Sequence, residues 1–201
     1  MEVLIVSLKG LKVGFALTGS FCTFSKVLPQ IERLVKEGCS VYPIMSYSAL
    51  NTDTRFGSAK EWKDKITAIA GHEPITTIKD AEPIGPDNFL DVVIIAPCTG
   101  NTLAKLANGI TDTPVLMAVK AQLRNKKPVI LAISTNDGLS MNAKNLGLIL
   151  NTKLIYLVPF GQDNPEKKAN SLVAHMELIP ETIEYAMKNE QVQPLLREYR
   201  Q

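Results

Sequence analysis

Long apolar runs and a strong net charge are both missing from this chain of 201 residues. No apolar stretch approaches the roughly 20 residues that a helix needs to span a bilayer, which argues against a membrane protein. The 22 basic and 20 acidic residues leave a formal net charge of +2 without a basic stripe, so charge gives no support for nucleic-acid binding. Residues 1–10 include an acid at Glu2 and no small-residue cleavage site, and they make a poor signal peptide.

Cysteine is also scarce, and its placement limits metal and redox chemistry. The three cysteines, at positions 22, 39 and 98, show no metal-ligand spacing, and their odd number argues against a disulfide framework. The sequence therefore predicts a cytoplasmic protein without a metal site. Cys22 and Cys98 each stand where a predicted helix begins, a position that lowers the pKa of a thiol. Cysteine is also a common small buried residue, and this packing role is the one expected for both.

Two nucleotide-binding fingerprints are absent as well. The first strand is not followed by the dinucleotide fingerprint Gly-x-Gly-x-x-Gly, and the chain does not contain the P-loop pattern Gly-x-x-x-x-Gly-Lys-Ser/Thr. The usual dinucleotide and P-loop sites are therefore excluded. What is present is an alternation of apolar strands and amphipathic helices. It predicts a single α/β domain over residues 1–201, with a doubly wound, Rossmann-like, mostly parallel sheet and helices on both faces. Strands are predicted at 11–17, 41–45, 92–96, 129–133 and 154–158, and helices at 23–36, 58–70, 102–108, 115–123, 139–150 and 171–187.

Several connections lack this regular pattern. Pro97 has no N–H to donate and is expected to end the strand 92–96. Residues 74–78 predict a short strand, and the prolines and glycine of 83–86 are expected to break regular structure. The polar residues 159–170 predict a long loop, after which Ser171 is expected to cap the last helix.

Small polar residues follow three of the predicted strands. They are 18–20 (Thr-Gly-Ser), 98–101 (Cys-Thr-Gly-Asn) and 134–136 (Ser-Thr-Asn). The carboxyl ends of parallel strands lie on one edge of a sheet, where open α/β proteins bind their ligands. The second group also opens a helix, whose free N–H groups and dipole favour an anion. The sequence therefore predicts that loops from several strands hold a phosphorylated ligand together.

The same loops carry a family resemblance. Thr18-Gly19-Ser20, taken with the stretch from Ala96 to Lys105, is similar to the flavoprotein family that includes phosphopantothenoylcysteine decarboxylase and flavin prenyltransferase. In that family the mid-chain motif reads Pro-Ala-Ser-Ala-Asn-Thr. The resemblance implies FMN bound between the subunits of a homotrimer or a multiple of it. It implies cofactor contacts at Thr18, Gly19, Ser20, Ser46, Pro97, Thr99, Asn101, Thr102 and Asn136.

A closer resemblance extends over almost the whole chain. Residues 52–57, 111–118, 134–137 and 158–163 are similar to the dipicolinate synthase B subunits of spore-forming bacteria. This implies oxidation of dihydrodipicolinate to dipicolinate in the mother cell during sporulation. It also implies a partner, the Rossmann-type dipicolinate synthase A subunit, which supplies an NADP site. The hydride could pass to FMN or directly to NADP, and the sequence leaves both routes open.

A dicarboxylate substrate calls for basic partners, and arginine suits carboxylates best because of its bidentate fork. The candidates are Arg55, Lys167 and Lys168, each of which could instead be a solvated surface charge. No catalytic base is identified by the sequence.

Two features of the decarboxylase relatives are absent. They use a histidine just upstream of the central strand, whereas residues 82–87 contain none. They also carry a cysteine in a C-terminal lid, whereas no cysteine follows Cys98 here. His72 and His175 are expected to have surface or packing roles. Two alternatives to the oxidoreductase therefore remain: a non-catalytic structural partner of the A subunit, and a flavin-dependent decarboxylase of another substrate.

Overall fold

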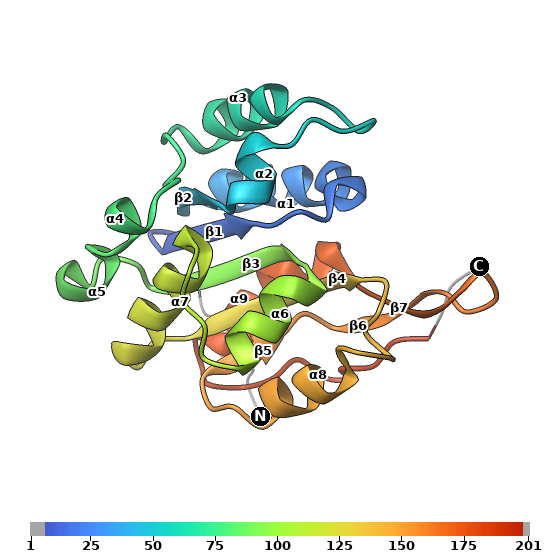
Figure 1. The fold of residues 1–201 in the computed structure, drawn as a ribbon. Helices are drawn as coiled ribbons and strands as arrows, with labels where there is room; N and C mark the ends of the chain where they lie inside the picture. Colours follow the sequence, from blue (N-terminus) through green and yellow to red (C-terminus); the bar gives the residue numbers. More distant parts are fainter. Residues whose placement is uncertain (1–6, 199–201) are drawn as a thin grey trace.

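A central sheet with helices on both faces organises the chain (Figure 1). The computed structural model describes residues 7–198. The elements of the first half are β1 (Lys12–Leu17), a 3-10 turn (Phe21–Thr23), α1 (Phe24–Lys36), β2 (Ser40–Met45), α2 (Tyr47–Asn51), α3 (Ala59–Ala70), α4 (Ile78–Ala81), α5 (Ile84–Asp87) and β3 (Val92–Cys98). Those of the second half are α6 (Gly100–Ala107), α7 (Pro114–Arg124), β4 (Val129–Thr135), α8 (Ala143–Leu150), β5 (Ile155–Leu157), β6 (Phe160–Asn164), β7 (Lys168–Ala174), a 3-10 turn (Met176–Leu178) and α9 (Ile179–Ala186).

Five strands of the sheet are parallel, in the order β2-β1-β3-β4-β5. The chain leaves β1 in one direction to form β2 and returns on the other side to form β3, so the order reverses between β1 and β3. In open α/β sheets, ligands bind outside the carboxyl ends of the strands at such a switch point. The antiparallel pair β6–β7 extends the sheet beyond β4, and β7 pairs with β4 through Ser134 and Thr135. The predicted fold class is confirmed.

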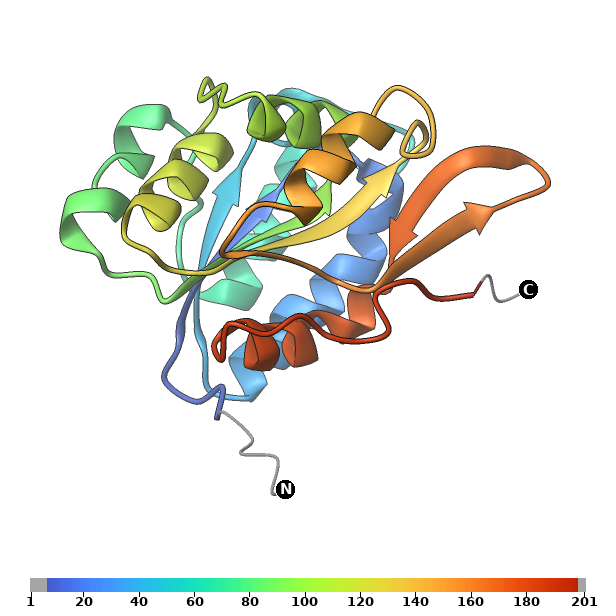
Figure 2. The same cartoon turned by 90° about the horizontal axis from the view of Figure 1, so that it is seen from below.

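The helices form a layer on each face (Figure 2). On one face α1 packs against α3 and α9, and on the other α7 packs against α4, α5 and α6, with α8 beside α6. The sequence explains why α1 is a helix with one buried side, because its apolar residues recur three and four positions apart. Its buried residues are Phe24, Val27, Leu28, Ile31 and Leu34.

The strand β3 is buried along its whole length, since each of its seven residues is inaccessible to solvent. Burial of a valine or isoleucine side chain contributes about 1.5–3 kcal/mol. Residues that follow β3 are therefore attached to a fully buried strand, and a precise binding site requires this kind of rigid support.

The prediction that Pro97 ends this strand is wrong, because β3 continues to Cys98. The sheet tolerates the missing N–H by irregular pairing: the register between β3 and β4 shifts between Ile95 and Cys98. On the other side, the backbone pairing of β1 with β3 stops at Ile95, and a side chain takes over. The Thr18 hydroxyl donates to the Pro97 carbonyl at 2.5 Å and accepts the Thr99 N–H at 3.1 Å.

Two further predictions fail between β2 and β3. Residues 74–78 do not form a strand but only one bridge, between Ile75 and Ile44. The segment 83–86, expected to be irregular, contributes to the short helix α5. The preceding helix α4 is capped by the Thr77 side chain, which accepts the Asp80 N–H. These one-turn helices are too short to show apolar periodicity in a sequence.

The C-terminal third differs most from expectation. Residues 159–170 are not a loop, because most of them build the hairpin β6–β7. Ser171 does not cap a helix; it lies in β7, where its hydroxyl donates to the Thr135 carbonyl at 3.2 Å. The last helix begins only at Ile179. The hairpin projects from the body (Figure 2), so its outer half is polar on both faces and lacks the apolar alternation typical of a strand.

Within residues 7–198, no helix has the length and apolar character needed to cross a membrane.

Candidate functional site

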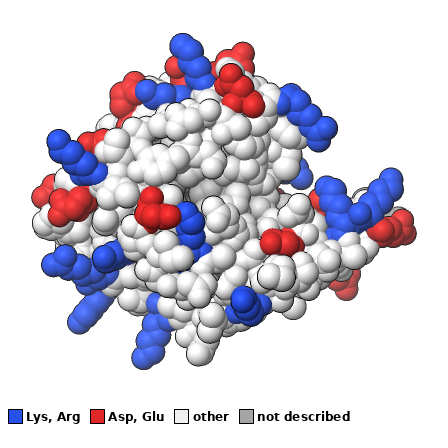
Figure 3. All heavy atoms as spheres, viewed as in Figure 1, with Lys and Arg blue, Asp and Glu red and all other residues white. Residues whose placement is uncertain are grey.

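A cavity of about 780 Å³ lies at the carboxyl edge of the sheet, beside the switch point. Its walls come from the loop after β1, the first turn of α6, the end of β4 and the hairpin β6–β7. In the space-filling view a hollow opens at the middle of this face, bordered mainly by uncharged atoms, while charged side chains gather over the hairpin (Figure 3). The lining residues are Gly19 to Thr23, Lys26, Thr54, Phe56, Thr99, Gly100, Asn101, Ser134 to Asp137, Asp163, Lys168, Ser171, Leu172 and Val173.

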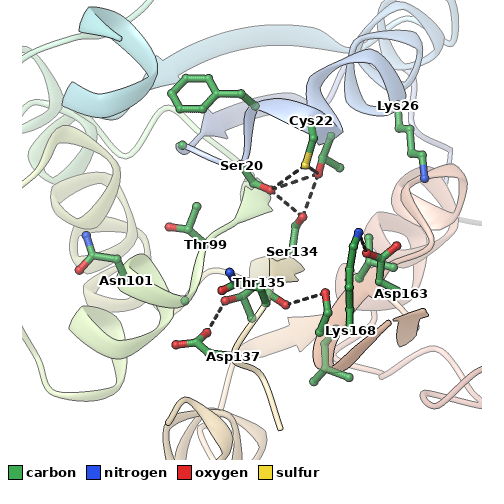
Figure 4. A pocket seen from close by; sticks show the side chains of 18 of the residues that line it. Ser20, Cys22, Lys26, Thr99, Asn101, Ser134, Thr135, Asp137, Asp163 and Lys168 are labelled. Atoms are coloured by element: carbon green, nitrogen blue, oxygen red, sulfur yellow. Dashed lines mark hydrogen bonds and ion pairs between the residues drawn. The ribbon is translucent and has the colours of Figure 1, made fainter. Parts of the chain in front are cut away.

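Three hydroxyl groups form a ring inside this cavity (Figure 4). The Ser134 Oγ lies 2.8 Å from the Ser20 Oγ and 2.9 Å from the Thr23 Oγ1, and the last two atoms are 3.2 Å apart. Thr23 and Ser134 are buried. The ring joins the loop after β1 to the end of β4. Because each hydroxyl can rotate to donate or to accept, the ring suits a polar ligand of either kind.

The first turn of α6 forms another part of the wall. Thr99 caps this helix: its Oγ1 accepts the Thr102 N–H at 3.3 Å. Gly100 and Asn101 follow as the first helical residues and line the cavity. The first N–H groups of a helix have no partner within it, and the helix dipole makes this end positive. The wall therefore offers hydrogen-bond donors to an anionic group.

A carboxylate stands next to this helix start. Asp137 accepts the Thr135 hydroxyl on one oxygen at 2.5 Å and the Asn142 side-chain amide on the other at 2.7 Å. Asn142 in turn accepts the Asn145 amide at 2.9 Å. A Cβ at position 100 would lie 2.5 Å from Asn142 Nδ2 and from Thr135 Oγ1, and 2.6 Å from Asp137 Oδ1. Only glycine at position 100 leaves room for this arrangement.

The remaining charged side chains lie on the opposite side of the cavity (Figure 4). Lys26 comes from α1, and Asp163 and Lys168 face each other across the hairpin as an ion pair. This contact lies at the exposed rim, where an ion pair contributes little stability. The cavity thus has a basic rim on the hairpin side and a carboxylate on the α6 side.

Half of the sequence-predicted cofactor and substrate residues line the cavity. They are Gly19, Ser20, Thr99, Asn101, Asn136 and Lys168.

Four of the others are not among the lining residues, and their polar atoms form hydrogen bonds inside the protein. The Thr18 hydroxyl bridges Pro97 and Thr99, as described above. Thr102 is buried with its Oγ1 3.0 Å from that of Thr99, and Ser46 caps α2 by accepting the Ala49 N–H at 3.2 Å. Contacts of Thr18, Ser46, Pro97 and Thr102 with a ligand stay a prediction.

The two remaining basic candidates lie outside the cavity. Arg55 stands between two lining residues, but its guanidinium lies 4.9 Å from the centre of the Phe56 ring. Lys167 is in the turn of the hairpin, where its N–H donates to the Asn164 side chain at 2.9 Å.

Sequence reasoning missed Lys26 and Asp137 as members of the site. Asp137 directly follows the predicted strand-end group 134–136, which was the available signal. Lys26 gives no signal, since it meets the hairpin only through the tertiary fold.

The two cysteines expected at helix starts have different environments. Cys22 is exposed and lines the cavity, with its Sγ 3.7 Å from the Thr23 Oγ1, so the expectation of a buried residue is wrong there. Cys98 is completely buried in β3, as expected, and burial raises its pKa to about 12. Among residues 7–198, no His, Cys, Asp and Glu side chains form a group of three that could hold a metal ion.

Comparison with known proteins gives consistent matches. The model of the family described as Flavoprotein matches residues 5–182. The dipicolinate synthase B subunit of Bacillus subtilis (strain 168) is 54% identical over 192 residues, covering 96% of each protein. The crystal structure of the dipicolinate synthase B subunit from Bacillus halodurans C has 51% identity and a TM-score of 0.88, covering 96% of this chain and 99% of that one. Burkholderia xenovorans DmrB in complex with FMN shares the fold, with a TM-score of 0.61 at 17% identity over 73% of this chain and 87% of that one.

Proposed function

Since the chain belongs to the Flavoprotein family, we propose that it works as the B subunit of an enzyme that oxidises dihydrodipicolinate to dipicolinate, with FMN as the cofactor of its cavity. The observation that carries the proposal is the cavity itself, which lies at the switch point of a sheet without a dinucleotide fingerprint. The 54% identity to a protein named as the B subunit of dipicolinate synthase supplies the substrate class.

The lining residues fit a flavin mononucleotide. The volume of about 780 Å³ is within the range of small-molecule sites. Gly19, Ser20 and the first turn of α6 at Asn101 offer hydroxyl and N–H donors for a phosphate, without the lysine that a P-loop uses. FMN, when bound, supplies a two-electron acceptor for hydride. The FMN complex of DmrB, which has the same fold, supports this choice.

The residues of the chain would handle a dianionic substrate at the hairpin side of the cavity. Lys168 and Lys26 place positive charge there, and the hydroxyl ring at Ser134 lies between this rim and the α6 start. With its two carboxylates bound at the rim, the substrate would point its ring toward the interior of the cavity. The buried strand β3 keeps the α6 side of the site fixed while the substrate binds.

The proposal includes two kinds of partner, namely the A subunit and further copies of this chain. The A subunit, with a Rossmann-type NADP site, would accept electrons from FMN or take the hydride directly. The chain would form a homotrimer or a multiple of it, with the cytoplasm of the mother cell as its setting. A protein of related fold described as a dodecameric FMN-dependent decarboxylase is consistent with higher assembly.

The environments of the histidines make a decarboxylase that depends on histidine the weaker alternative. His72 stacks on Tyr42 with ring centres 4.5 Å apart, and the His175 Nδ1 lies 3.3 Å from the Glu177 carboxylate. Neither histidine lines the cavity. Helix α5 and its flanks provide no other imidazole, since residues 82–87 contain no histidine.

The visible absorption spectrum of the purified chain is the first test. We expect flavin bands, or their appearance on titration with FMN, and we expect Ser20→Ala and Asn101→Ala to weaken FMN binding. Ser25→Ala, an exposed serine on α1 outside the lining, is the matched control. Dipicolinate formation is then measured with and without NADP and the A subunit. Absence of FMN binding in calorimetry would refute the cofactor, and full activity of both variants would favour a structural partner of the A subunit.

A further inference from the structure

We propose that Asp137 is the general base that removes the proton from the substrate ring during dehydrogenation. The inference rests on the proposed function and assigns the base that the sequence leaves unidentified. Asp137 lines the same cavity as the hydroxyl ring and the first turn of α6.

The Asp137 carboxylate is held in one orientation by a built network. Thr135 and Asn142 each donate to a different carboxylate oxygen, at 2.5 and 2.7 Å. Asn142 and Asn145 are 6% and 5% exposed, so the amide chain behind the carboxylate is almost completely buried. A group that acts on a reacting atom needs this kind of support, because small displacements are costly. Each carboxylate oxygen keeps a further lone pair that can accept a proton.

The glycine at the start of α6 fits this role. A side chain at position 100 would overlap the carboxylate and both of its donors. The position therefore lets the carboxylate lie against the positive end of a helix while it still borders the cavity. A carboxylate that served only to tie the loop to β4 would not need to face the ligand space.

The distribution of charge separates Asp137 from the other carboxylate of the cavity. Asp163 is paired with Lys168 on the hairpin. None of the salt bridges within residues 7–198 includes Asp137. Lys26 would attract a carboxylate of the substrate to the hairpin side, where the second carboxylate would compete with Asp163 for Lys168, and the ring would then lie between these lysines and Asp137. This arrangement places a base opposite the groups that bind the substrate.

The step balances in atoms and electrons. One ring C–H bond of dihydrodipicolinate breaks with its electron pair, and the hydride passes to a two-electron acceptor, the flavin or the partner's NADP. The C–H bond on the neighbouring carbon loses its hydrogen as a proton to an Asp137 oxygen. Its electron pair forms the new C=C bond and completes the aromatic ring. Solvent then takes the proton from Asp137.

The test uses the chain together with the hydride acceptor and the A subunit. Asp137→Asn keeps the shape of the side chain, and Asp112→Asn is the matched control, because Asp112 pairs with Lys105 at the far end of α6. We expect Asp137→Asn to lower kcat by about 100-fold or more, the range for loss of a general base, with KM and the flavin spectrum almost unchanged. Asp112→Asn should retain the wild-type kcat.

Two further measurements distinguish a base from a purely structural carboxylate. Deuterium on the ring carbon that loses the proton should give a larger isotope effect in Asp137→Asn than in the wild type. Formate should restore part of the activity of Asp137→Ala, which a structural role would not allow. A kcat within threefold of the wild type in Asp137→Asn, or a loss without rescue and with a lowered melting temperature, overturns the assignment. An inactive wild-type complex refutes the proposed function itself, and the assignment falls with it.

Discussion

Replacement of Gly100 by alanine gives a sharp test of the network at the start of α6. In most helices alanine is favoured over glycine by up to about 1 kcal/mol. At position 100, however, the new Cβ would lie 2.5–2.6 Å from three polar atoms, whereas carbon contacts normally begin near 3.5 Å. Those atoms cannot move without breaking the hydrogen bonds that hold Asp137.

The magnitude follows from these contacts. Overpacking costs about 1–3 kcal/mol, and a hydrogen bond to a charged group contributes about 1.5–3 kcal/mol. After subtraction of the gain in helix propensity, we expect Gly100→Ala to lower the free energy of unfolding by about 2 kcal/mol. For a chain of this size, that corresponds to a decrease in Tm of about 4–8 °C.

Gly147→Ala is the matched control. Gly147 also lies in a helix, α8, but nothing stands within 4 Å of the position of its Cβ, and the residue is exposed. Here the same substitution should raise Tm by about 2–4 °C or leave it unchanged. Differential scanning calorimetry of both variants measures the effect. If Gly100→Ala is as stable as Gly147→Ala, the reasoning about the crowded helix start is wrong.

The remaining predictions concern the rim of the cavity and the thiols. Lys168→Gln should weaken binding of dipicolinate roughly three- to tenfold, a modest effect because the side chain is 58% exposed and water screens its charge. Lys167→Gln, which lies outside the cavity, should leave the affinity unchanged. If calorimetry gives Lys168→Gln the same affinity for dipicolinate as the wild type, Lys168 has no role in binding. At pH 8 a thiol reagent should label Cys22 alone in the folded protein, because burial raises the pKa of Cys39 to about 11 and that of Cys98 to about 12; rapid labelling of all three would contradict this burial. In the folded protein the pKa values of both thiols lie above the ordinary thiol value of 9.0. The free energy of unfolding should therefore be unaffected by these thiols below pH 9 and should decrease as the pH rises above 9 through about 11 and 12. Urea unfolding at each pH measures this decrease.

Much of the fold could be predicted because hydrophobic patterning records it directly. The apolar run 92–96 and the periodic residues of 23–36 lie in a buried strand and a one-sided helix, as expected. The strand-end loops also meet at one edge, which is a property of any parallel sheet. The hairpin β6–β7 was missed for the complementary reason: its outer half projects into solvent and carries no apolar signal.

The site was less predictable because its composition depends on contacts between distant residues. Thr18 has the residue type of a phosphate ligand, yet its hydroxyl bridges Pro97 and Thr99. Ser20 and Ser134 are 114 positions apart, and their hydrogen bond depends on how β1 and β4 are placed in the sheet. Asp137 lies one residue beyond the predicted group, and its carboxylate is oriented by Thr135 and by the buried amide of Asn142, which Asn145 supports in turn.

The attachment of the hairpin has a consequence for ligand exchange. Its base is fixed to β4 through Ser134 and Thr135 and is held further by Ser171, whereas its outer half projects from the body and contains no buried residue. Segments with few buried contacts open locally at a lower free energy than the whole protein needs to unfold. The rim that bears Lys168 should therefore fluctuate about an immobile base. Ligands could then enter and leave on this side while the α6 wall and the hydroxyl ring keep their geometry.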